Sequence, residues 1–578
     1  MRARIRWYLP ALLLFLHSLA AQAQTGGSER LTAAQWRDDF RFVVTAIKTI
    51  HPRPFHQVPE RVFDSTARAV EAGLARRSDR ENVVALMGLV ALVRDAHTSL
   101  RPGGKVFRLD RGYPIRIDRL PGGIFVVAAA PRYKDLLGDE VRQIGGRPAA
   151  TVWDNLEAIS PGDNAFSRMA AVPIWLGMPE LMTAMHLGSA EGLGLEVRDE
   201  NGASRTVRVE AVPAAFDYYK LDSGDAPGDA SVRLPGRDPA VDELPLLHSA
   251  DIYWFTLDRS SGFLYAQMNA VQNADRPVWL DGTEAKATVA QFAERVLGLV
   301  DSGLVRTVVI DLRRNPGGNN NLVVPFVNGI AARPAINQRG KLFVVTGRRT
   351  YSAAMNFTSL LEDRTQALFV GEPPGGSPSH YGDASGFVLP HSGLRLNVST
   401  LHWDLGVRPT DVREVMDPDI AAPPRIADLR SGRDGPLAAI KNWRPGTILS
   451  EELLQVYKDR GLDSAIAVAR RAVSTGDPAP WASRSQQLTK FGYGLVRSRA
   501  SGPDIYRAFD LATELYPESA DAWFERGRVY AFSGRWRDVE FSYAKAHALR
   551  PTNDLISRML EVAHRQAAAL ARSKTGTR

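Results

Sequence analysis

No cysteine occurs at any of the 578 positions of the sequence. Disulfide bonds, zinc sites built from thiolates, a cysteine nucleophile and a lipid-modified cysteine are therefore excluded. The HExxH pattern of zinc hydrolases is also missing, and the glycine-rich stretch 317–321 lacks the lysine of a nucleotide-binding loop. We expect no metal ion and no organic cofactor. A chain of this length can bury a core large enough to fold without disulfides.

Long apolar runs are scarce, and the one that matters lies at the N-terminus. Three arginines among the first six residues precede an apolar stretch from Trp7 to about Ala21, and a small-x-small pattern ends at Ala23. These features predict a secretory signal peptide over residues 1–23, cleaved near Ala23. The stretch is short for a membrane-spanning helix, although an uncleaved anchor is the alternative interpretation. We therefore expect an exported protein, periplasmic or secreted, without a transmembrane segment.

Strong charge of one sign is absent as well. The formal net charge is +8, and the basic residues are scattered among acidic ones instead of forming runs. Such a mild excess supports solubility and gives no basic patch of the kind that binds nucleic acid. We expect no nucleic-acid partner.

The apolar patterns predict several domains of mixed α/β class. Three- and four-residue spacing predicts helices near the N-terminus, short runs predict strands after them, and strands alternating with helices from Ile252 onward predict parallel βαβ units. Within the strand-rich part, residues 136–152 resemble the end of a PDZ-like module. The predicted boundaries are 30–104 for a helical N-terminal domain, 105–215 for the PDZ-like region, 216–250 for a loop or linker, 251–425 for an α/β domain, 426–450 for a second linker and 451–570 for a helical tail.

The helical tail carries an internal repeat. Phe509 and Tyr543 are 34 residues apart, and an alanine and a proline follow each of them at the same offsets. This period is typical of tetratricopeptide repeats, in which large aromatic and small residues alternate so that paired helices stack closely. The tail is therefore predicted to be tetratricopeptide-like. It would bind a protein partner or merely cover the domain before it.

Ser352 lies where a predicted strand, 342–346, gives way to a predicted helix. A hydroxyl at the positive end of a helix has free backbone N–H groups beside it, which can receive an oxyanion. Ala353 follows directly, and Gly317 and Gly318 end another buried strand with backbone that a substrate can approach closely. These residues predict an acyl-transfer site with Ser352 as nucleophile and Ala353 with Gly317 or Gly318 as oxyanion donors.

Ser352 has two other interpretations, of which the sequence leaves one open and excludes the other. The hydroxyl could merely cap its helix, and the neighbouring sequence leaves that alternative open. The nucleophile elbow of the α/β-hydrolases is excluded, because GxSxG occurs nowhere in the sequence.

A resemblance to a known family adds to this reading. Together with RDAHTSL (94–100), which resembles the family's Asp-x-His-Thr element, four motifs follow in the order of the S41 serine peptidases, the family of C-terminal processing peptidases and the tricorn core. These motifs are VVIDLRRNPGG (308–318), TYSAAMNFTS (350–359), FVGEPPGGSP (369–378) and MDPDIAAP (416–423). The resemblance covers roughly residues 35–440. It implies a ClpP/crotonase-like catalytic domain and a peptide or unfolded protein as substrate.

The resemblance also indicates the base. The processing branch of the family uses a lysine, but Ser377 stands at that position, 25 residues after Ser352. A neutral hydroxyl cannot take the proton of Ser352. The tricorn-like branch uses a histidine, which matches His97, although Ala96 replaces the serine that precedes it in tricorn. An unperturbed imidazole titrates near neutrality, so we predict His97 as the general base.

The acid that orients the histidine is less well defined. Asp411, Glu414 and Asp417 all lie in the stretch that leads to the Pro-Asp-Ile element at 418–420. The distance from that element favours Asp411, with Asp417 next.

Together these features predict an exported serine peptidase with a Ser352/His97/Asp411 site. Two other functions stay open at this point. The fold could hold a peptide or another ligand without cleaving it, or it could act as an esterase-like hydrolase on small acyl substrates.

Overall fold

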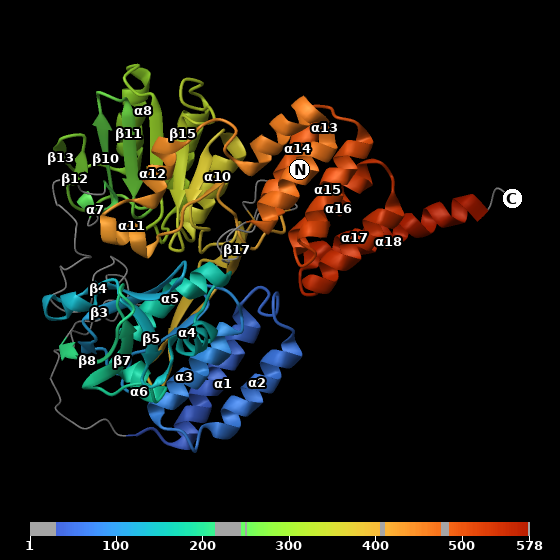
Figure 1. The fold of residues 1–578 in the computed structure, drawn as a ribbon. Coiled ribbons are helices and arrows are strands. Elements are labelled where there is room, and N and C mark those ends of the chain that lie inside the picture. Colours follow the sequence, from blue (N-terminus) through green and yellow to red (C-terminus); the bar gives the residue numbers. More distant parts are fainter. Residues whose placement is uncertain (1–29, 214–243, 249–250, 405–410, 476–484, 576–578) are drawn as a thin grey trace, which may run out of the picture.

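The computed structural model describes residues 30–213, 244–248, 251–404, 411–475 and 485–575. Figure 1 shows two lobes, one above the other, with a group of helices beside them. The predicted signal peptide and most of the predicted loop 216–250 lie outside the described residues; α7 (Leu244–Leu247) is the helix described within that loop. None of the helices in the described part of the chain is both long and apolar enough to span a bilayer.

The first lobe begins with three helices, α1 (Ala33–Ile50), α2 (Glu60–Gly73) and α3 (Asp79–Ala91). Capping boxes start α1 and α3, where Thr32 and Ser78 accept backbone N–H groups that no helical carbonyl can reach. Apolar side chains on one face of each helix enter the core, as the sequence periodicity predicts.

An antiparallel sheet packs against these helices. Its strand order is β3-β4-β5-β7-β8, with β6 paired to β5, and helices α4, α5 and α6 lie between β6 and β7 in sequence. One hydrophobic cluster joins the sheet to the three helices, so the predicted domains 30–104 and 105–215 share a single core. The bounds are β2 (Arg111–Gly112), β3 (Ile115–Leu120), β4 (Gly123–Ala129), η1 (Pro131–Leu136), β5 (Glu140–Ile144), β6 (Arg147–Pro148), α4 (Ala149–Ala158), α5 (Ala165–Leu176), α6 (Pro179–Ala184), β7 (Gly192–Arg198), β8 (Ser204–Glu210) and β9 (Val212–Pro213).

The second lobe is an eight-stranded sheet in the order β13-β12-β10-β11-β14-β15-β16-β21. Strands β11, β14, β15, β16 and β21 are parallel neighbours, which agrees with the predicted βαβ units. The bounds are β10 (Tyr253–Asp258), β11 (Phe263–Met268), β12 (Val278–Leu280), β13 (Thr283–Ala285), α8 (Val289–Asp301), β14 (Thr307–Asp311), η4 (Asn320–Leu322), α9 (Val324–Ala331), β15 (Leu342–Thr346), α10 (Ala353–Arg364), β16 (Leu368–Gly371) and β21 (Ile420–Ala421).

Helices cover both faces of this sheet. One face packs against α8, α9 and α10. The other face receives Leu437 and Ile440 of α12 (Gly435–Asn442), which follows α11 (Ile426–Ser431). The prediction of a linker over 426–450 is therefore wrong, because apolar side chains in this proline- and glycine-rich stretch complete a core.

A segment of the second lobe crosses to the first. It contains β17 (Ser379–Gly382), β18 (Ser385–Val388), β19 (Arg395–Val398) and β20 (Leu401–Asp404). β19 pairs antiparallel with β1 (Ser99–Arg101), and its apolar side chains enter the core of the first lobe. The two lobes are thereby joined at β1, which begins two residues after His97.

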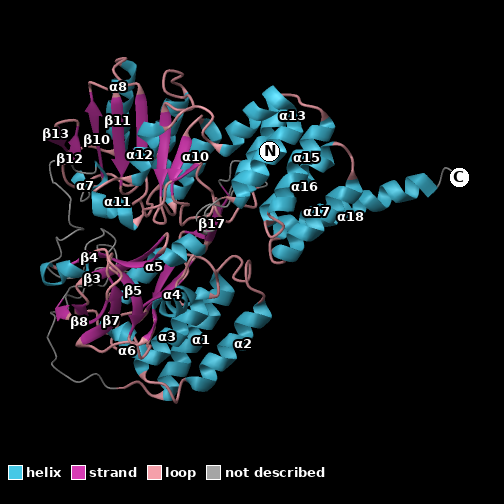
Figure 2. Ribbon diagram, viewed as in Figure 1, coloured by secondary structure: helices cyan, strands magenta, loops and turns pink. Residues whose placement is uncertain are grey.

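The tail consists of helices that pack in sequence order beside the second lobe (Figure 2). Their bounds are α13 (Leu449–Ser474), with a break in helical geometry at Gly461, then α14 (Ser485–Arg497), α15 (Gly502–Leu515), α16 (Ala520–Phe532), α17 (Trp536–Leu549) and α18 (Asp554–Thr575). Each of two helix pairs closes on a glycine: a Cβ on Gly492 would lie 2.6 Å from the Phe509 ring, and one on Gly527 would lie 2.5 Å from the Tyr543 ring. The two aromatic rings, 34 residues apart in sequence, thus each lie over a glycine.

We expect Gly527→Ala to destabilise the tail, because the added methyl group overlaps the buried Tyr543 ring. Overpacking of this kind costs about 1–3 kcal/mol. Gly298→Ala is the matched control, since nothing lies within 4 Å of its Cβ position in α8, and alanine there should stabilise the helix by about 0.5–1 kcal/mol. Thermal denaturation of both variants tests this, and equal midpoints would contradict the close packing.

Candidate active site

Ser352 occupies a strained turn between β15 and α10. Its backbone angles are φ 55° and ψ −128°, and it precedes the first residue of α10. A positive φ is costly for a residue with a side chain, roughly 1–3 kcal/mol, and such strain is concentrated at functional sites. The hydroxyl makes no capping hydrogen bond to the helix. The interpretation of Ser352 as a simple helix cap therefore does not fit, and the turn has the strand-to-helix form of a nucleophile elbow without the GxSxG pattern.

Glycine 317 makes room for this turn. A Cβ on Gly317 would lie 2.6 Å from the Cβ of Ser352, and its φ is +109°. Both the close approach and the backbone angle require glycine. The Gly-Gly loop after β14 is thus pressed directly against the serine.

The predicted oxyanion donors differ in whether their backbone N–H is already hydrogen-bonded. The N–H of Gly317 already donates to Oδ1 of Asn315, at 2.9 Å. In the described part of the chain no acceptor takes up the N–H of Gly318 or of Ala353, the latter being in the first turn of α10. Gly318 and Ala353 are therefore the two predicted donors that remain available.

His97 lies against the serine from the other lobe. Its Nε2 is 3.0 Å from Oγ of Ser352, a hydrogen bond across 255 positions of sequence. The Tyr351 ring covers the imidazole, with ring centroids 4.5 Å apart. The two residues chosen from sequence as nucleophile and base are thus brought together.

Asp95 holds the loop that carries His97. This carboxylate is 1% exposed and accepts four hydrogen bonds. The donors are the His97 backbone N–H at 2.9 Å, the Thr98 and Ser399 hydroxyls at 2.6 Å each and Nε2 of His51 at 3.2 Å. Ser399 follows β19, so the carboxylate ties the histidine loop to the segment that crosses between the lobes.

The partner of Asp95 on the inner side is His51. The backbone N–H of Arg53 donates to Nδ1 of His51, at 3.0 Å, so the proton of a neutral ring is on Nε2 and points to Asp95. Burial acts to raise the pKa of Asp95, but the His51 hydrogen bond and the neighbouring imidazoles outweigh it and hold the pKa well below its ordinary value. Asp95 is a buried negative charge beside His97 and Ser352.

The imidazole of His97 is tuned by burial and by this charge. Its Nδ1 lies 4.0 Å from Oδ1 of Asp95. Burial lowers the pKa of His97 below its ordinary value, and the negative charge of Asp95 and a hydrogen bond with the backbone of Tyr381 oppose this shift. The ring is therefore neutral, and able to accept a proton, at neutral pH.

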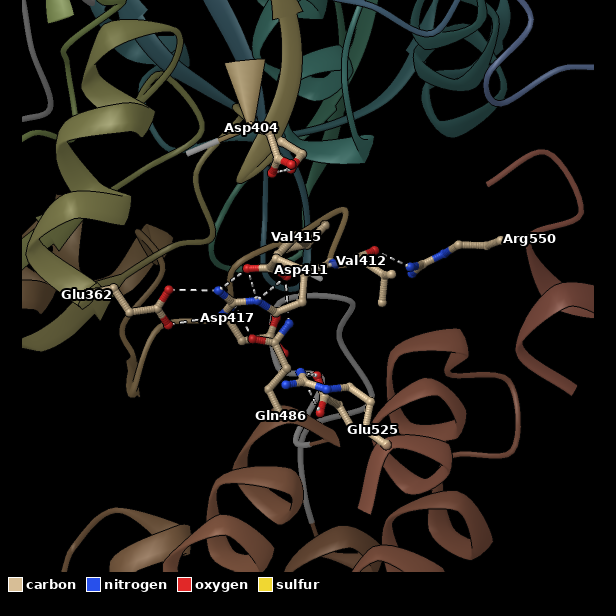
Figure 3. Close-up of polar contacts among 12 residues, drawn as sticks. Glu362, Asp404, Asp411, Val412, Val415, Asp417, Gln486, Glu525 and Arg550 are labelled. Atoms are coloured by element: carbon tan, nitrogen blue, oxygen red, sulfur yellow. Dashed lines mark hydrogen bonds and ion pairs between the residues drawn. The ribbon is translucent and has the colours of Figure 1, made fainter. Parts of the chain in front are cut away.

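Asp411 is not the hydrogen-bond partner of this imidazole. Its carboxylate is bound by the guanidinium of Arg413, at 2.7 and 3.0 Å, and Arg413 also binds Glu362 of α10. The sequence-based choice of Asp411 as orienting acid is therefore not supported by the geometry, since an arginine takes up its carboxylate (Figure 3).

The two alternative acids also face the tail. A carboxylate oxygen of Glu414 lies 3.3 Å from Nε of Arg550. The backbone N–H of Asp417 donates to the side-chain oxygen of Gln486 in α14. Burial raises the pKa of Asp417 to about 7. Residues 411–419 form a strap between the second lobe and the tail (Figure 3).

Ser377, at the position of the family's lysine, is a structural link. Its hydroxyl donates to the carbonyl of Glu414 at 2.6 Å, and its N–H points to Asp163. The same carboxyl of Asp163 accepts the N–H of Ala96 at 2.9 Å. Burial raises the pKa of Asp163 to about 8. Sequence reasoning missed Asp163, Asp95 and His51; Asp95 is part of the RDAHTSL motif, which was the available signal.

No group of three or more histidine, aspartate or glutamate residues in the described ranges is placed to hold a metal ion. His380 instead stacks on His97, with centroids 6.0 Å apart and planes 10° from parallel. Its Nδ1 bonds the carbonyl of Ser377, and burial lowers its pKa to about 4. A neutral aromatic ring thus backs the base.

Replacing Asp95 by asparagine should lower the pKa of His97 further, because the charge that favours the imidazolium is removed. Titration of the His97 Cε1–H resonance by NMR measures this. Ser399→Ala is the control, since it removes one hydrogen bond from Asp95 but leaves the charge. A His97 pKa that is unchanged or higher in Asp95→Asn would contradict the assigned electrostatics.

Comparisons with known proteins give likeness to solved structures. No protein-family model matches the sequence, and no curated protein matches it. A structure of mature CPAF complexed with lactacystin is 14% identical, with 71% of this chain and 97% of that chain covered and a TM-score of 0.49. The photosystem II D1 C-terminal processing protease is 14% identical, with 69% and 98% covered and a TM-score of 0.31.

An S41 protease from Bacteroides fragilis is 12% identical, with 57% of this chain and 82% of that chain covered and a TM-score of 0.27. The solved structures to which the chain is similar thus include two named as proteases. One of these is named for the S41 family that the sequence motifs resemble.

Proposed function

We propose that this protein is an exported serine peptidase of the S41 type, with Ser352 as nucleophile and His97 as general base. The observation that supports this most directly is the 3.0 Å contact between Nε2 of His97 and Oγ of Ser352. A hydroxyl in a strained strand-to-helix turn, a neutral imidazole and two free backbone N–H groups are the parts that acyl transfer needs. Peptides or unfolded proteins are the proposed substrates.

The reaction follows from these parts. His97 takes the Ser352 proton as Oγ attacks the carbonyl carbon of the peptide bond, and a tetrahedral oxyanion forms. The N–H groups of Gly318 and Ala353 stabilise that oxyanion, where one donor is worth roughly 10²–10³ in rate. The imidazolium then returns its proton to the leaving amine, and water resolves the acyl-enzyme by the reverse proton transfers.

In this proposal Asp95, and not Asp411, is the acid that acts on His97. It lies 4.0 Å from Nδ1 of His97 and stays ionised, so it stabilises the imidazolium that forms during attack. It also fixes the loop through the His97 backbone N–H. Asp95 therefore acts as a positioning residue through the loop and as a charge through space.

Labelling with an active-site-directed serine phosphonate tests the nucleophile. The label should attach to Ser352, and Ser352→Ala or His97→Ala should lower peptide hydrolysis by roughly 10⁴–10⁶-fold. Ser359→Ala is a matched control in the same helix, because its buried hydroxyl has no hydrogen-bond partner among the described residues and alanine there leaves the site intact.

Loss of labelling in Ser352→Ala but not in Ser359→Ala supports the proposal. Hydrolysis that survives in Ser352→Ala would overturn it. Turnover of simple esters without any cleavage of a peptide library would assign the site to small acyl substrates instead.

Export is tested by expressing the full chain and fractionating the cells. The mature protein should be recovered outside the cytoplasm with Gln24 as its first residue, because the signal sequence pattern ends at Ala23. A product that retains Met1 and stays in the cytoplasm would contradict this part of the proposal.

A further inference from the structure

A cavity of about 280 Å³ lies one aromatic ring away from the candidate active site. Ser377 and His380 line it, and His380 stacks on His97. Its other walls come from distant parts of the chain: Arg53, His56 and Gln57 after α1, β17 and β20 of the crossing segment, and residues 549–555 with Arg558 at the junction of α17 and α18. The tail therefore forms one wall of a space beside the catalytic pair.

Most of the arginines in this wall already have a carboxylate. Arg53 pairs with Asp554, Arg413 with Asp411, and Arg550 with Glu414. Two arginines of the lining, the exposed Arg558 and the half-buried Arg94, make no side-chain hydrogen bond or ion pair with any residue that the structure describes.

The surroundings of Arg94 carry too little negative charge to balance it. Glu157 is the carboxylate whose charge reaches it, and Arg168 lies 3.7 Å from the same Glu157. Asp163 also lines the cavity, but burial raises its pKa to about 8, so it is mostly protonated at neutral pH. Arg94, Arg168 and Arg119 thus share the charge of Glu157, and the other carboxylate near Arg168, Glu414, is paired with Arg550.

The remaining charges of the cavity lining do not cancel this surplus. Asp404 accepts a hydrogen bond from the Ser379 hydroxyl, and the exposed guanidinium of Arg558 has no ion-pair partner in the described ranges. Asp404 and Arg558 carry opposite charges, so together they leave the net charge of the lining unchanged. Arg94 is therefore the half-buried guanidinium of the lining that has no ion-pair partner among the described residues.

We propose that the cavity is a subsite for a carboxylate group of the peptide substrate, with Arg94 as its main partner. A guanidinium presents a planar fork of donors that matches the two oxygens of a carboxylate, and partial burial strengthens such a pair. The carboxylate is the terminal group of the peptide or an aspartate or glutamate side chain. This inference rests on the proposed function for its substrate but concerns binding alone.

The test measures binding in Ser352→Ala protein, so that cleavage does not interfere. The probes are four fluorescein-labelled peptides: hexaalanine as free acid and as amide, and the amide with one alanine replaced by glutamate or by glutamine. Fluorescence anisotropy gives their dissociation constants. We expect a charged probe to bind about tenfold or more tightly than its neutral counterpart, the usual worth of a charge-assisted hydrogen bond.

The added variants decide whether Arg94 is responsible. Arg94→Gln in the Ser352→Ala background should remove the preference for the charged probe, whereas Arg61→Gln, on the exposed face of α2, should leave it. Preference for the free acid over the amide assigns a chain end, and preference for glutamate over glutamine assigns a side chain.

Two results would overturn the inference: equal binding of charged and neutral probes, or a preference that survives in Arg94→Gln with an unchanged melting temperature. Neither depends on hydrolysis. A chain that binds the charged probe through Arg94 but never reacts with the phosphonate would retain the subsite and lose the peptidase proposal.

Discussion

The pairing of β1 with β19 is the contact on which the site depends. Ser352 belongs to the second lobe and His97 to the first, so their 3.0 Å contact exists because the crossing segment docks into the first lobe. The register sets Ser99 opposite Asn397, and Ser399, two residues further on, reaches back to Asp95. Buried apolar side chains of β19 in the first core stabilise this junction.

Two buried carboxylates, Asp95 and Asp163, hold the loop of His97 at this junction of the lobes. Asp95 is costly to bury as an ion, but four donors, the His51 ring among them, satisfy it, and the loss of any donor would leave charge uncompensated. Asp163 binds the N–H of Ala96 on one side and faces the N–H of Ser377 on the other. The loop of His97 is thus held from both lobes.

The tail reaches the same network through the strap of residues 411–419. Arg550 donates to the carbonyl of Val412 at 2.8 Å, and Gln486 donates to that of Val415 at 2.7 Å. The carbonyl of Glu414 in turn accepts the hydroxyl of Ser377. The acidic residues that looked like candidates for the third catalytic position are therefore the attachment of the helical tail, which also supplies a wall of the cavity beside His380.

Local patterns in the sequence determined the elements and the reacting groups. The strand-to-helix pattern in the sequence predicted the position of Ser352, and a short motif indicated His97. The Gly-Gly loop indicated the candidate oxyanion donors. These features depend on neighbouring residues, so they can be recognised from the sequence. Tertiary structure decided the rest. The Gly317 N–H donates to Asn315, Asp411 binds Arg413, and apolar side chains of the 426–450 stretch enter a core. Arg94 is left without an ion-pair partner among the residues that the structure describes. Each of these outcomes depends on which side chain from a distant segment arrives, and spacing along one chain does not encode that directly.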